Sequence, residues 1–184
     1  ISGKNTVAPD FDGHIDSVIM IPLQSKAIIL DIPLIKDGDN DTNPSMYYGS
    51  APFGTDGIWG GAVIYQSDGT DYSIEFASVA ASQPDTWGYS STALASASCN
   101  VWDRGNSVTV LLNVGDLTSA TEAECNLNPL LNMALLGSEL IQFATATLNG
   151  DGSYTLSDLK RGRRGTEWAA ASHVSNEAFF LMDA

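Results

Sequence analysis

Charged side chains are scarce in this sequence, and positive ones are the scarcest. Only 16% of the 184 residues are charged, and eight Lys and Arg stand against 22 Asp and Glu, for a net charge of −14. Binding to nucleic acid needs Lys and Arg spread over a surface that neutralises several phosphates. The balance therefore excludes general nucleic-acid binding, and the large net charge favours solubility.

Cysteine and histidine are rare as well, with two of each. Cys99 and Cys125 are too few for a disulfide framework or a metal site. We predict two free buried thiols, as in a reducing compartment; a single disulfide between them is the alternative. His14 and His173 lie at no zinc-ligand spacing, and a lone histidine beside an apolar closing segment is more often structural. We expect neither a metal centre nor a cofactor.

Long apolar runs are also missing. No run reaches the roughly 20 residues that a transmembrane helix needs, so we expect no insertion into a membrane. The sequence has no Gly-x-Ser-x-Gly nucleophile elbow, and Gly150-Asp151-Gly152 lacks the lysine of a phosphate-binding loop. Some pair of the many carboxylates will lie at glycosidase distance in any fold, but the sequence selects none. We expect a protein without catalytic activity.

The sequence does contain short alternating segments separated by turn residues. The clearest is 139–148, which we predict to be a ten-residue interior strand with apolar residues on both faces. Gly137-Ser138 suits a two-residue turn before it, with 133–136 as the preceding strand. Residues 149–152 favour a reversal after it, with 153–156 as the returning strand.

A helix over 127–135 is the alternative in this region, because its leucines recur at helical spacing and Asn128-Pro129 suits a helix start. Thr166 is a candidate cap for a helical turn or two over 166–171.

Val, Ile and aromatic content predicts further strands, namely 18–23, 27–32, 59–66, 72–79, 99–102, 107–114 and 178–182. We expect 59–66 to pair with 72–79 and 99–102 to pair with 107–114, with 83–98 and 115–128 as connections.

These patterns predict an all-β fold, an antiparallel β-sandwich or barrel-like domain with at most one or two short helices. We expect a single β-rich domain over 1–184, with a possible subdivision near 115–128. The chain begins without Met and ends just after an apolar run, which favours a piece of a longer protein.

Half of the basic residues lie together, at Lys160, Arg161, Arg163 and Arg164. The simplest interpretation is a solvated turn whose arginines pair with nearby carboxylates. The alternative is contact with an acidic surface, either on this chain or on a partner. We select Arg161, Arg163 and Arg164 as interface candidates that make bidentate contacts to carboxylates, within the subunit or across an interface.

Two further patterns bear on binding. Oxygen-bearing side chains alternate in one polar loop, as in calcium loops, at Asp37, Asp39, Asp41 and Asn43. An EF-hand starting at Asp37 requires glycine at position 42 and glutamate at position 48, where this chain has Thr42 and Tyr48. The match is therefore poor, and a solvated loop is the alternative.

The four tryptophans, Trp59, Trp87, Trp102 and Trp168, are candidates for a sugar-stacking platform; the alternative is that they fill the core.

Several motifs occur in an order that resembles a known family. They are Asn132-x-Ala, Gly137-x-Glu-Leu-Ile-Gln-Phe, Tyr154-x-Leu-Ser-x-Leu and Arg161-Gly-Arg-Arg-Gly-Thr-Glu. Upstream segments 29–34, 59–63 and 67–69 also fit, as do His173 and 179–183. This ordered set resembles the C-terminal region of the large tail-tip hub proteins, or megatrons, of siphophages and gene transfer agents.

The resemblance implies a structural protein of a virion. It would be a component of a phage-like tail tip or baseplate hub, assembled in the bacterial cytoplasm as a homotrimer in the full-length assembly. Its partners would be other tail and baseplate proteins, and a cell-surface glycan is a further expected contact. The alternative function is a carbohydrate- or receptor-binding β-sandwich module.

Overall fold

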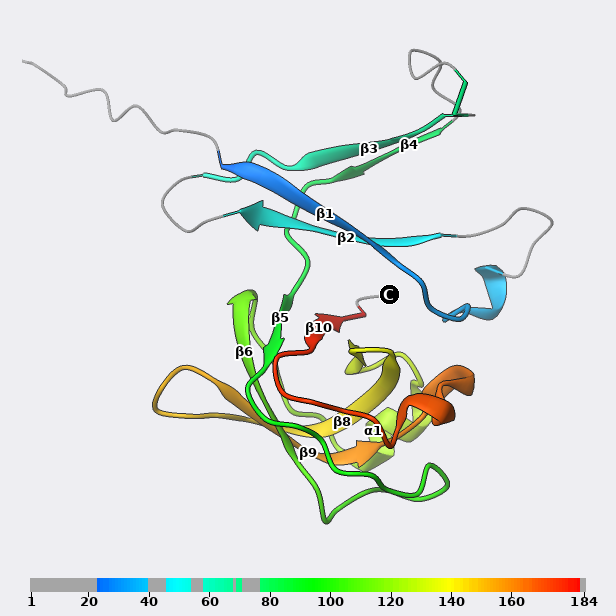
Figure 1. Cartoon of the computed structure of the whole chain (residues 1–184), viewed down its shortest axis with the longest axis vertical. Coiled ribbons are helices and arrows are strands. Elements are labelled where there is room, and N and C mark those ends of the chain that lie inside the picture. Colours follow the sequence, from blue (N-terminus) through cyan, green and yellow to red (C-terminus); the bar gives the residue numbers. More distant parts are fainter. Residues whose placement is uncertain (1–22, 40–45, 54–57, 68, 71–76, 183–184) are drawn as a thin grey trace, which may run out of the picture.

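The computed structural model describes residues 23–39, 46–53, 58–67, 69–70 and 77–182. Within these ranges the chain is built almost entirely of antiparallel strands, with one α-helix and three short 3-10 helices. A closed six-stranded barrel forms the lower part in Figure 1, and two separate two-stranded sheets lie above it. The predicted all-β class with few helices is confirmed.

The barrel strands follow the order β10-β5-β6-β9-β8-β7. Their bounds are β5 Trp87–Ser90, β6 Val108–Val114, β7 Met133–Leu136, β8 Glu139–Leu148, β9 Tyr154–Lys160 and β10 Ala178–Leu181. Strands β7, β8 and β9 are consecutive hairpins. The turns between them need positive φ, which Gly137 (58°) and Gly152 (85°) supply. The predicted strands 133–136 and 139–148 are confirmed with these bounds.

Apolar side chains fill the barrel interior. The buried cluster consists of Leu94, Val108, Val110, Leu117, Ala134, Leu136, Ile141, Phe143, Tyr154, Leu156, Leu159 and Phe179. Leu156 and Leu159 are three residues apart, so a regular strand would place them on opposite faces. Asp158 lies between them with a φ of 52°. This irregularity lets both leucines enter the same core.

One predicted hairpin is wrong. Residues 99–102 form no strand, and β6 pairs with β5 on one side and β9 on the other. The segment between β5 and β6 instead makes a single bridge to β9, where the Asp103 and Leu159 backbones bond at 2.7 and 3.0 Å. Strand β5 falls inside the predicted 83–98 connection. Its four residues are too few to show a period, and its partner β10 lies at the far end of the chain.

The one α-helix among the described residues lies in a segment that we predicted as a connection. Helix α1 spans Glu122–Leu127 and is fixed at its start by a capping box between Thr121 and Glu124. It lies in the predicted 115–128 connection, so the alternative of a helix over 127–135 is wrong. At its C-terminal end, the buried Gln142 side chain donates from Nε2 to the carbonyls of Cys125, Asn128 and Leu131. These bonds hold α1 against β8.

Two 3-10 turns follow β9, η2 over Arg163–Gly165 and η3 over Glu167–Ala169. Thr166 precedes η3, but its side chain does not cap that turn. The Thr166 hydroxyl donates to the Arg163 carbonyl and accepts a bond from the Leu140 N–H at 2.9 Å. Thr166 therefore ties the turns to β8.

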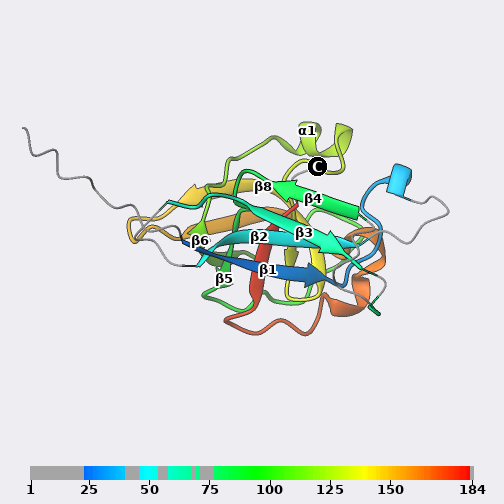
Figure 2. The ribbon, with the colours of Figure 1, turned by 90° about the horizontal axis from the view of Figure 1, so that it is seen from above.

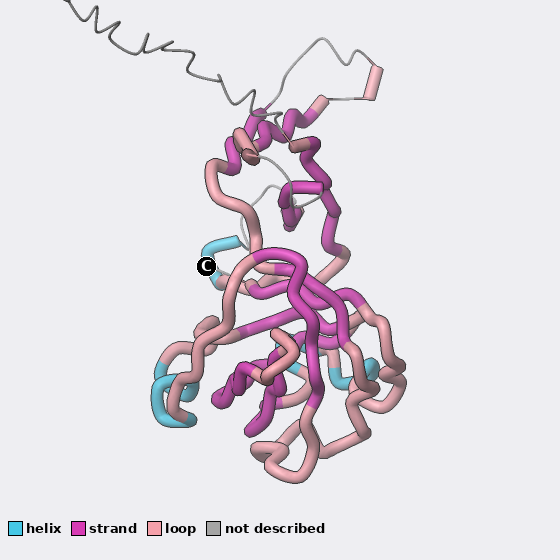
Figure 3. The backbone as a smooth tube through the Cα atoms, turned by 90° about the vertical axis from the view of Figure 1, so that its left-hand side faces the viewer, coloured by secondary structure: helices cyan, strands magenta, loops and turns pink. Residues whose placement is uncertain are grey.

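The upper part contains β1 (Gln24–Leu30), η1 (Asp37–Asp39), β2 (Tyr47–Phe53), β3 (Ala62–Gln66) and β4 (Ala77–Ala81). The β3–β4 pairing confirms the predicted hairpin in register Gln66↔Ala77, whereas 71–76 lie outside the described residues. The predicted strand 18–23 falls almost wholly outside them, and 27–32 overlaps β1. Figure 1 shows that β1–β2 lies between β3–β4 and the barrel. In Figure 2 the strands β1 to β4 overlie the barrel when the molecule is seen from above, and Figure 3 shows the same upper and lower parts from the side.

A second apolar cluster joins β1–β2 to the outer face of the barrel. Its buried members are Leu30, Ile35, Ala51, Trp87, Met133, Leu135, Leu140, Phe180 and Met182. Lys26, Ile28 and Leu30 alternate along β1 and present one face to the barrel. Trp87 and Phe180 stack with ring centroids 6.0 Å apart at this contact. Burial of this face holds the first sheet on the barrel.

Candidate functional site

The basic residues that follow one another at 160–164 differ in burial and in their contacts. Arg161, just after β9, is only 1% exposed. Its Nε and Nη2 donate to the two carboxylate oxygens of Glu139, at 3.0 and 2.8 Å. Glu139 opens β8 and is fully buried. The Arg161 contact is thus a bidentate pair within the chain, at one end of the barrel.

Backbone and side-chain groups complete the surroundings of this pair. Arg161 Nη1 donates to the Ala95 carbonyl at 2.8 Å and to Asp103 Oδ2 at 3.3 Å. Its Nη2 also reaches the Ala170 carbonyl at 3.0 Å. These partners belong to the loops before β6 and after β9. The guanidinium therefore ties both loops to the barrel strands.

His173 extends the network. Its Nε2 lies 2.6 Å from Glu139 Oε2, and its Nδ1 lies 2.6 Å from Glu177 Oε2. Each ring nitrogen faces a carboxylate, an arrangement that suits the doubly protonated imidazolium because it donates from both nitrogens. The bond to Glu139 raises the pKa of His173 and outweighs the effect of burial.

Glu139 is held as a carboxylate. Burial alone raises the pKa of its carboxyl, but hydrogen bonds from His173 and Arg161 and the Arg161 charge outweigh burial and lower that pKa. The side chains of Arg161 and Glu139 are 0% exposed and that of His173 is 2% exposed. We name these residues, with Asp103 and Glu177, the buried charge network. Because this network is shielded from solvent, it is suited to hold the loops before β6 and after β9 against the end of the barrel.

The other basic residues lie outside this network. Arg163 is half-buried in η2, and its Nε has no hydrogen-bond partner among the described residues. Arg164 is exposed, with a φ of 56°. Lys160 Nζ lies 4.9 Å from the ring centroid of Trp102. Of the three interface candidates, Arg161 is thus enclosed, Arg163 is half-buried and Arg164 is exposed.

The polar loop is only partly described. Asp39 Oδ2 accepts bonds from the Lys36 N–H and the Tyr47 hydroxyl, whereas Asp41 and Asn43 lie outside the described residues. Within the described ranges, no three His, Cys, Asp or Glu side chains are grouped to hold a metal ion. Cys99 and Cys125 are free thiols; Cys125 is buried and Cys99 half-buried.

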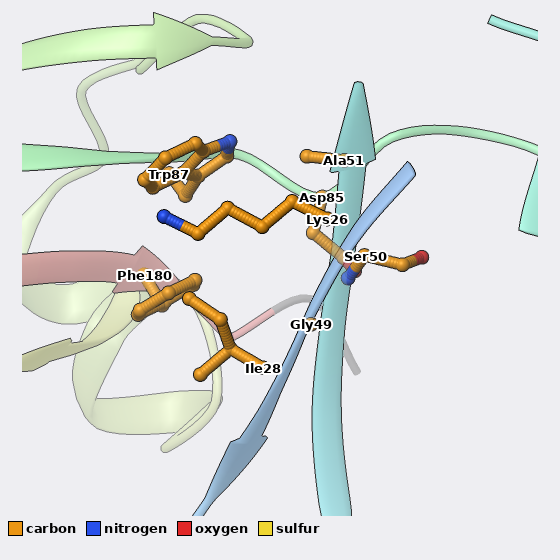
Figure 4. A pocket seen from close by; sticks show the side chains of 8 residues that line it. All are labelled: Lys26, Ile28, Gly49, Ser50, Ala51, Asp85, Trp87 and Phe180. Atoms are coloured by element: carbon orange, nitrogen blue, oxygen red, sulfur yellow. The ribbon is translucent and has the colours of Figure 1, made fainter. Parts of the chain in front are cut away.

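A groove of about 300 Å³ opens where β1–β2 meets β5 and β6. Its walls include Lys26, Phe53, Trp87, Tyr89 and Asn113, and we name it the aromatic groove. Figure 4 shows a second cavity that shares Lys26 and Trp87 with this groove; there the Lys26 side chain extends from β1 between the rings of Trp87 and Phe180. Its Nζ lies 4.3 Å from the Trp87 ring centroid.

The four tryptophans do not share one surface. Trp87 is 7% exposed and belongs to the cluster beneath β1–β2, whereas Trp168 is 73% exposed on η3. Trp59 is half-buried, and its Nε1 donates to Ser25 Oγ at 2.8 Å. Trp102 is half-buried beside Lys160. One tryptophan therefore contributes to the aromatic groove.

Sequence reasoning missed the carboxylates that surround Arg161. One signal was present: Glu139 alternates with Ile141 and Phe143 in a predicted interior strand, and a buried carboxylate requires a partner. Lys26 gave no comparable signal, because it lies between the predicted strands 18–23 and 27–32. Its inward position follows only from the β1–β2 register, in which it faces Ala51.

Comparison with known proteins concerns the barrel. No curated protein matches the chain. Separately, no helix among the described residues has the length and apolar character to cross a membrane. Residues 85–180, which contain β5 to β9 and all of β10 except Leu181, match the family described as Rcc01698-like, C-terminal. The matched segment is more than half of the 184 residues, and the protein therefore belongs to the Rcc01698-like, C-terminal family.

Proposed function

We propose that this chain is a structural component of a phage-like tail tip or baseplate hub and makes contacts that assemble it. Its partners are other tail and baseplate proteins, with the full-length protein as a homotrimer in a virion built in the bacterial cytoplasm. The resemblance to tail-tip hub proteins supports this assignment, because most of its motifs fall within the matched residues 85–180. The role is non-catalytic.

The observation that carries the proposal is the unpartnered β3–β4 sheet. Among the described residues it has only two strands, so both outer edges offer free backbone groups. Val63 and Tyr65 are 50% and 63% exposed on one face, and Val79 is 50% exposed on the other. An isolated two-stranded hairpin is marginally stable in water. A neighbouring protein chain that covers these faces supplies the stability that the isolated hairpin lacks.

The experiment that tests the proposal is localisation. Tailed particles from the source organism are labelled with an antibody raised against the barrel and viewed by electron microscopy. Gold label at the tail tip is the expected result, with particles from a strain deleted for the gene as the control. Label confined to the cell envelope, with none on particles, would contradict the proposal.

A second candidate function is recognition of a cell-surface glycan. The observation that favours it is the aromatic groove, which combines aromatic walls with a few polar groups as small-ligand sites do.

A further inference from the structure

The aromatic groove has an unusual charge for this chain. One cation, Lys26, lines it, and none of the residues that form its walls is acidic. The chain as a whole carries 22 carboxylates and only eight Lys and Arg. An anion in this groove therefore meets no acidic side chain in the groove walls.

Lys26 has no ionic partner in the described part of the chain. Its Nζ makes a long contact of 3.5 Å to the Tyr89 hydroxyl and lies over the Trp87 ring, and none of the ion pairs there includes it. The ring orients the ammonium but does not neutralise it. The ammonium thus has hydrogen-bond donors to offer to an anion in the groove.

Ring faces border the same cation. In the β1–β2 register Lys26 faces Ala51, so Phe53, two residues further along β2, lies on the same face of the sheet. Phe53 is 66% exposed. Tyr89 comes from β5 on the barrel side and packs edge-to-face on Trp87 with ring centroids 5.5 Å apart. The two walls therefore present aromatic surface on both sides of Lys26.

Polar groups complete the groove. Asn113 offers an amide with both donors and an acceptor, and the Tyr89 hydroxyl offers one of each. Such groups bind hydroxyls. The volume of about 300 Å³ is at the lower end of the range for small-molecule sites, so the occupant is small.

We propose that the aromatic groove binds an acidic sugar. The sugar carboxylate bonds to Lys26 Nζ, one ring face packs against Phe53 or Tyr89, and sugar hydroxyls bond to Asn113 and Tyr89. This inference rests on the second proposed function, glycan recognition, and is independent of the assembly role.

The test is titration of the full chain with glucuronic acid, with glucose as the neutral counterpart and acetate as the carboxylate alone. Binding is followed by calorimetry and by NMR shifts of Lys26 and Tyr89. We expect glucuronic acid to bind at least tenfold more tightly than glucose or acetate. Lys26→Met, which keeps the apolar stem, should reduce affinity for glucuronic acid at least tenfold, to about the level of glucose.

Phe53→Ala provides a second variant that does not disturb folding, because Phe53 is largely exposed; it should weaken both sugars. Lys36→Met, at an exposed lysine outside the groove, is the matched control and should change nothing. Equal binding of glucose and glucuronic acid would overturn the acidic-sugar assignment but keep glycan recognition. Acetate binding as tightly as glucuronic acid would overturn the stacking contact. Absence of binding by all three probes would overturn both the inference and the second proposed function.

Discussion

At the residue scale, the buried charge network is the feature that most constrains this chain. Burial of an ion pair costs desolvation energy that only good geometry and further hydrogen bonds offset. Arg161 meets this condition, because its guanidinium bonds to Glu139, Asp103 and two carbonyls. We infer that the network secures the loop positions at this barrel end more than it adds net stability.

Removal of one partner should therefore be costly. Arg161→Met leaves the Glu139 carboxylate buried without its main counter-charge, and we expect a loss of about 3–5 kcal/mol in the free energy of unfolding. Arg104→Met is the matched control. Arg104 also makes a bidentate pair, with Glu122, but its side chain is 62% exposed, and the expected loss is below about 1 kcal/mol. Urea unfolding measures both, and equal losses would contradict the account.

The His173 bonds predict a pH dependence. The folded state raises the pKa of His173, so the stability that it contributes is present below its ordinary pKa of about 6.5 and is lost as pH rises through the higher folded value. The pKa of Glu139 is lowered, so its contribution is lost as pH falls through the folded value, below its ordinary value of about 4.3.

Urea unfolding across pH measures this dependence. As pH rises from the ordinary histidine pKa of about 6.5 toward the raised folded pKa of His173, the free energy of unfolding should fall by up to about 1.4 kcal/mol per pH unit. His173→Gln should abolish that fall, and His14→Gln, at the only other histidine, should leave it unchanged. An alkaline fall of the same size in His173→Gln would show that another group is responsible.

At the element scale, closure of the barrel depends on the approach of β5 to β6. The register shifts between Trp87 and Gly88. A Cβ at Gly88 would lie 2.1 Å from the Leu111 carbonyl oxygen and 2.7 Å from the Leu112 Cα. These are backbone atoms, so a side chain at Gly88 requires the strands to separate.

Gly88→Ala should therefore destabilise the protein by about 1–3 kcal/mol, the usual cost of overpacking. Amide hydrogen exchange should rise mainly in β5 and β6. Gly150→Ala is the control, because no atom lies within 4 Å of its Cβ position, and its effect should stay within about 0.5 kcal/mol. Undisturbed exchange in β5 and β6 of the Gly88→Ala variant would argue against this packing.

The elements also show which parts of the fold the sequence could reveal. Strand β8 was predictable because a ten-residue segment with apolar residues on both faces lies between two turns, and both signals are local. Helix α1 carried its signal in Thr121 and Glu124, spaced as a capping box. Strand β5 had no comparable signal, because it is short and is defined by pairing with distant strands. The charge network was hidden for the same reason: Arg161 meets partners from separate segments.

At the scale of the whole molecule, the barrel and the β3–β4 sheet differ in how far their strand edges and apolar side chains are covered. The barrel has no open sheet edge, and its core is closed at one end by ionic bonds. The β3–β4 sheet lies farthest from the barrel in Figure 1 and is left with exposed apolar side chains. Among the described residues, a closed barrel thus carries a sheet of only two strands, and this contrast is why we propose that neighbouring subunits cover that sheet.

The most direct test of this assembly role is incorporation of a hairpin variant into particles. The double variant Val63→Asp, Val79→Asp puts a charge on each face of β3–β4, and Leu148→Asp, at a 62% exposed barrel position, is the control. Quantitative mass spectrometry of purified particles compares them with the wild type, after circular dichroism shows that all three fold. We predict that the double variant is at least tenfold depleted from particles and that Leu148→Asp is incorporated normally. Normal incorporation of the folded double variant would contradict the account.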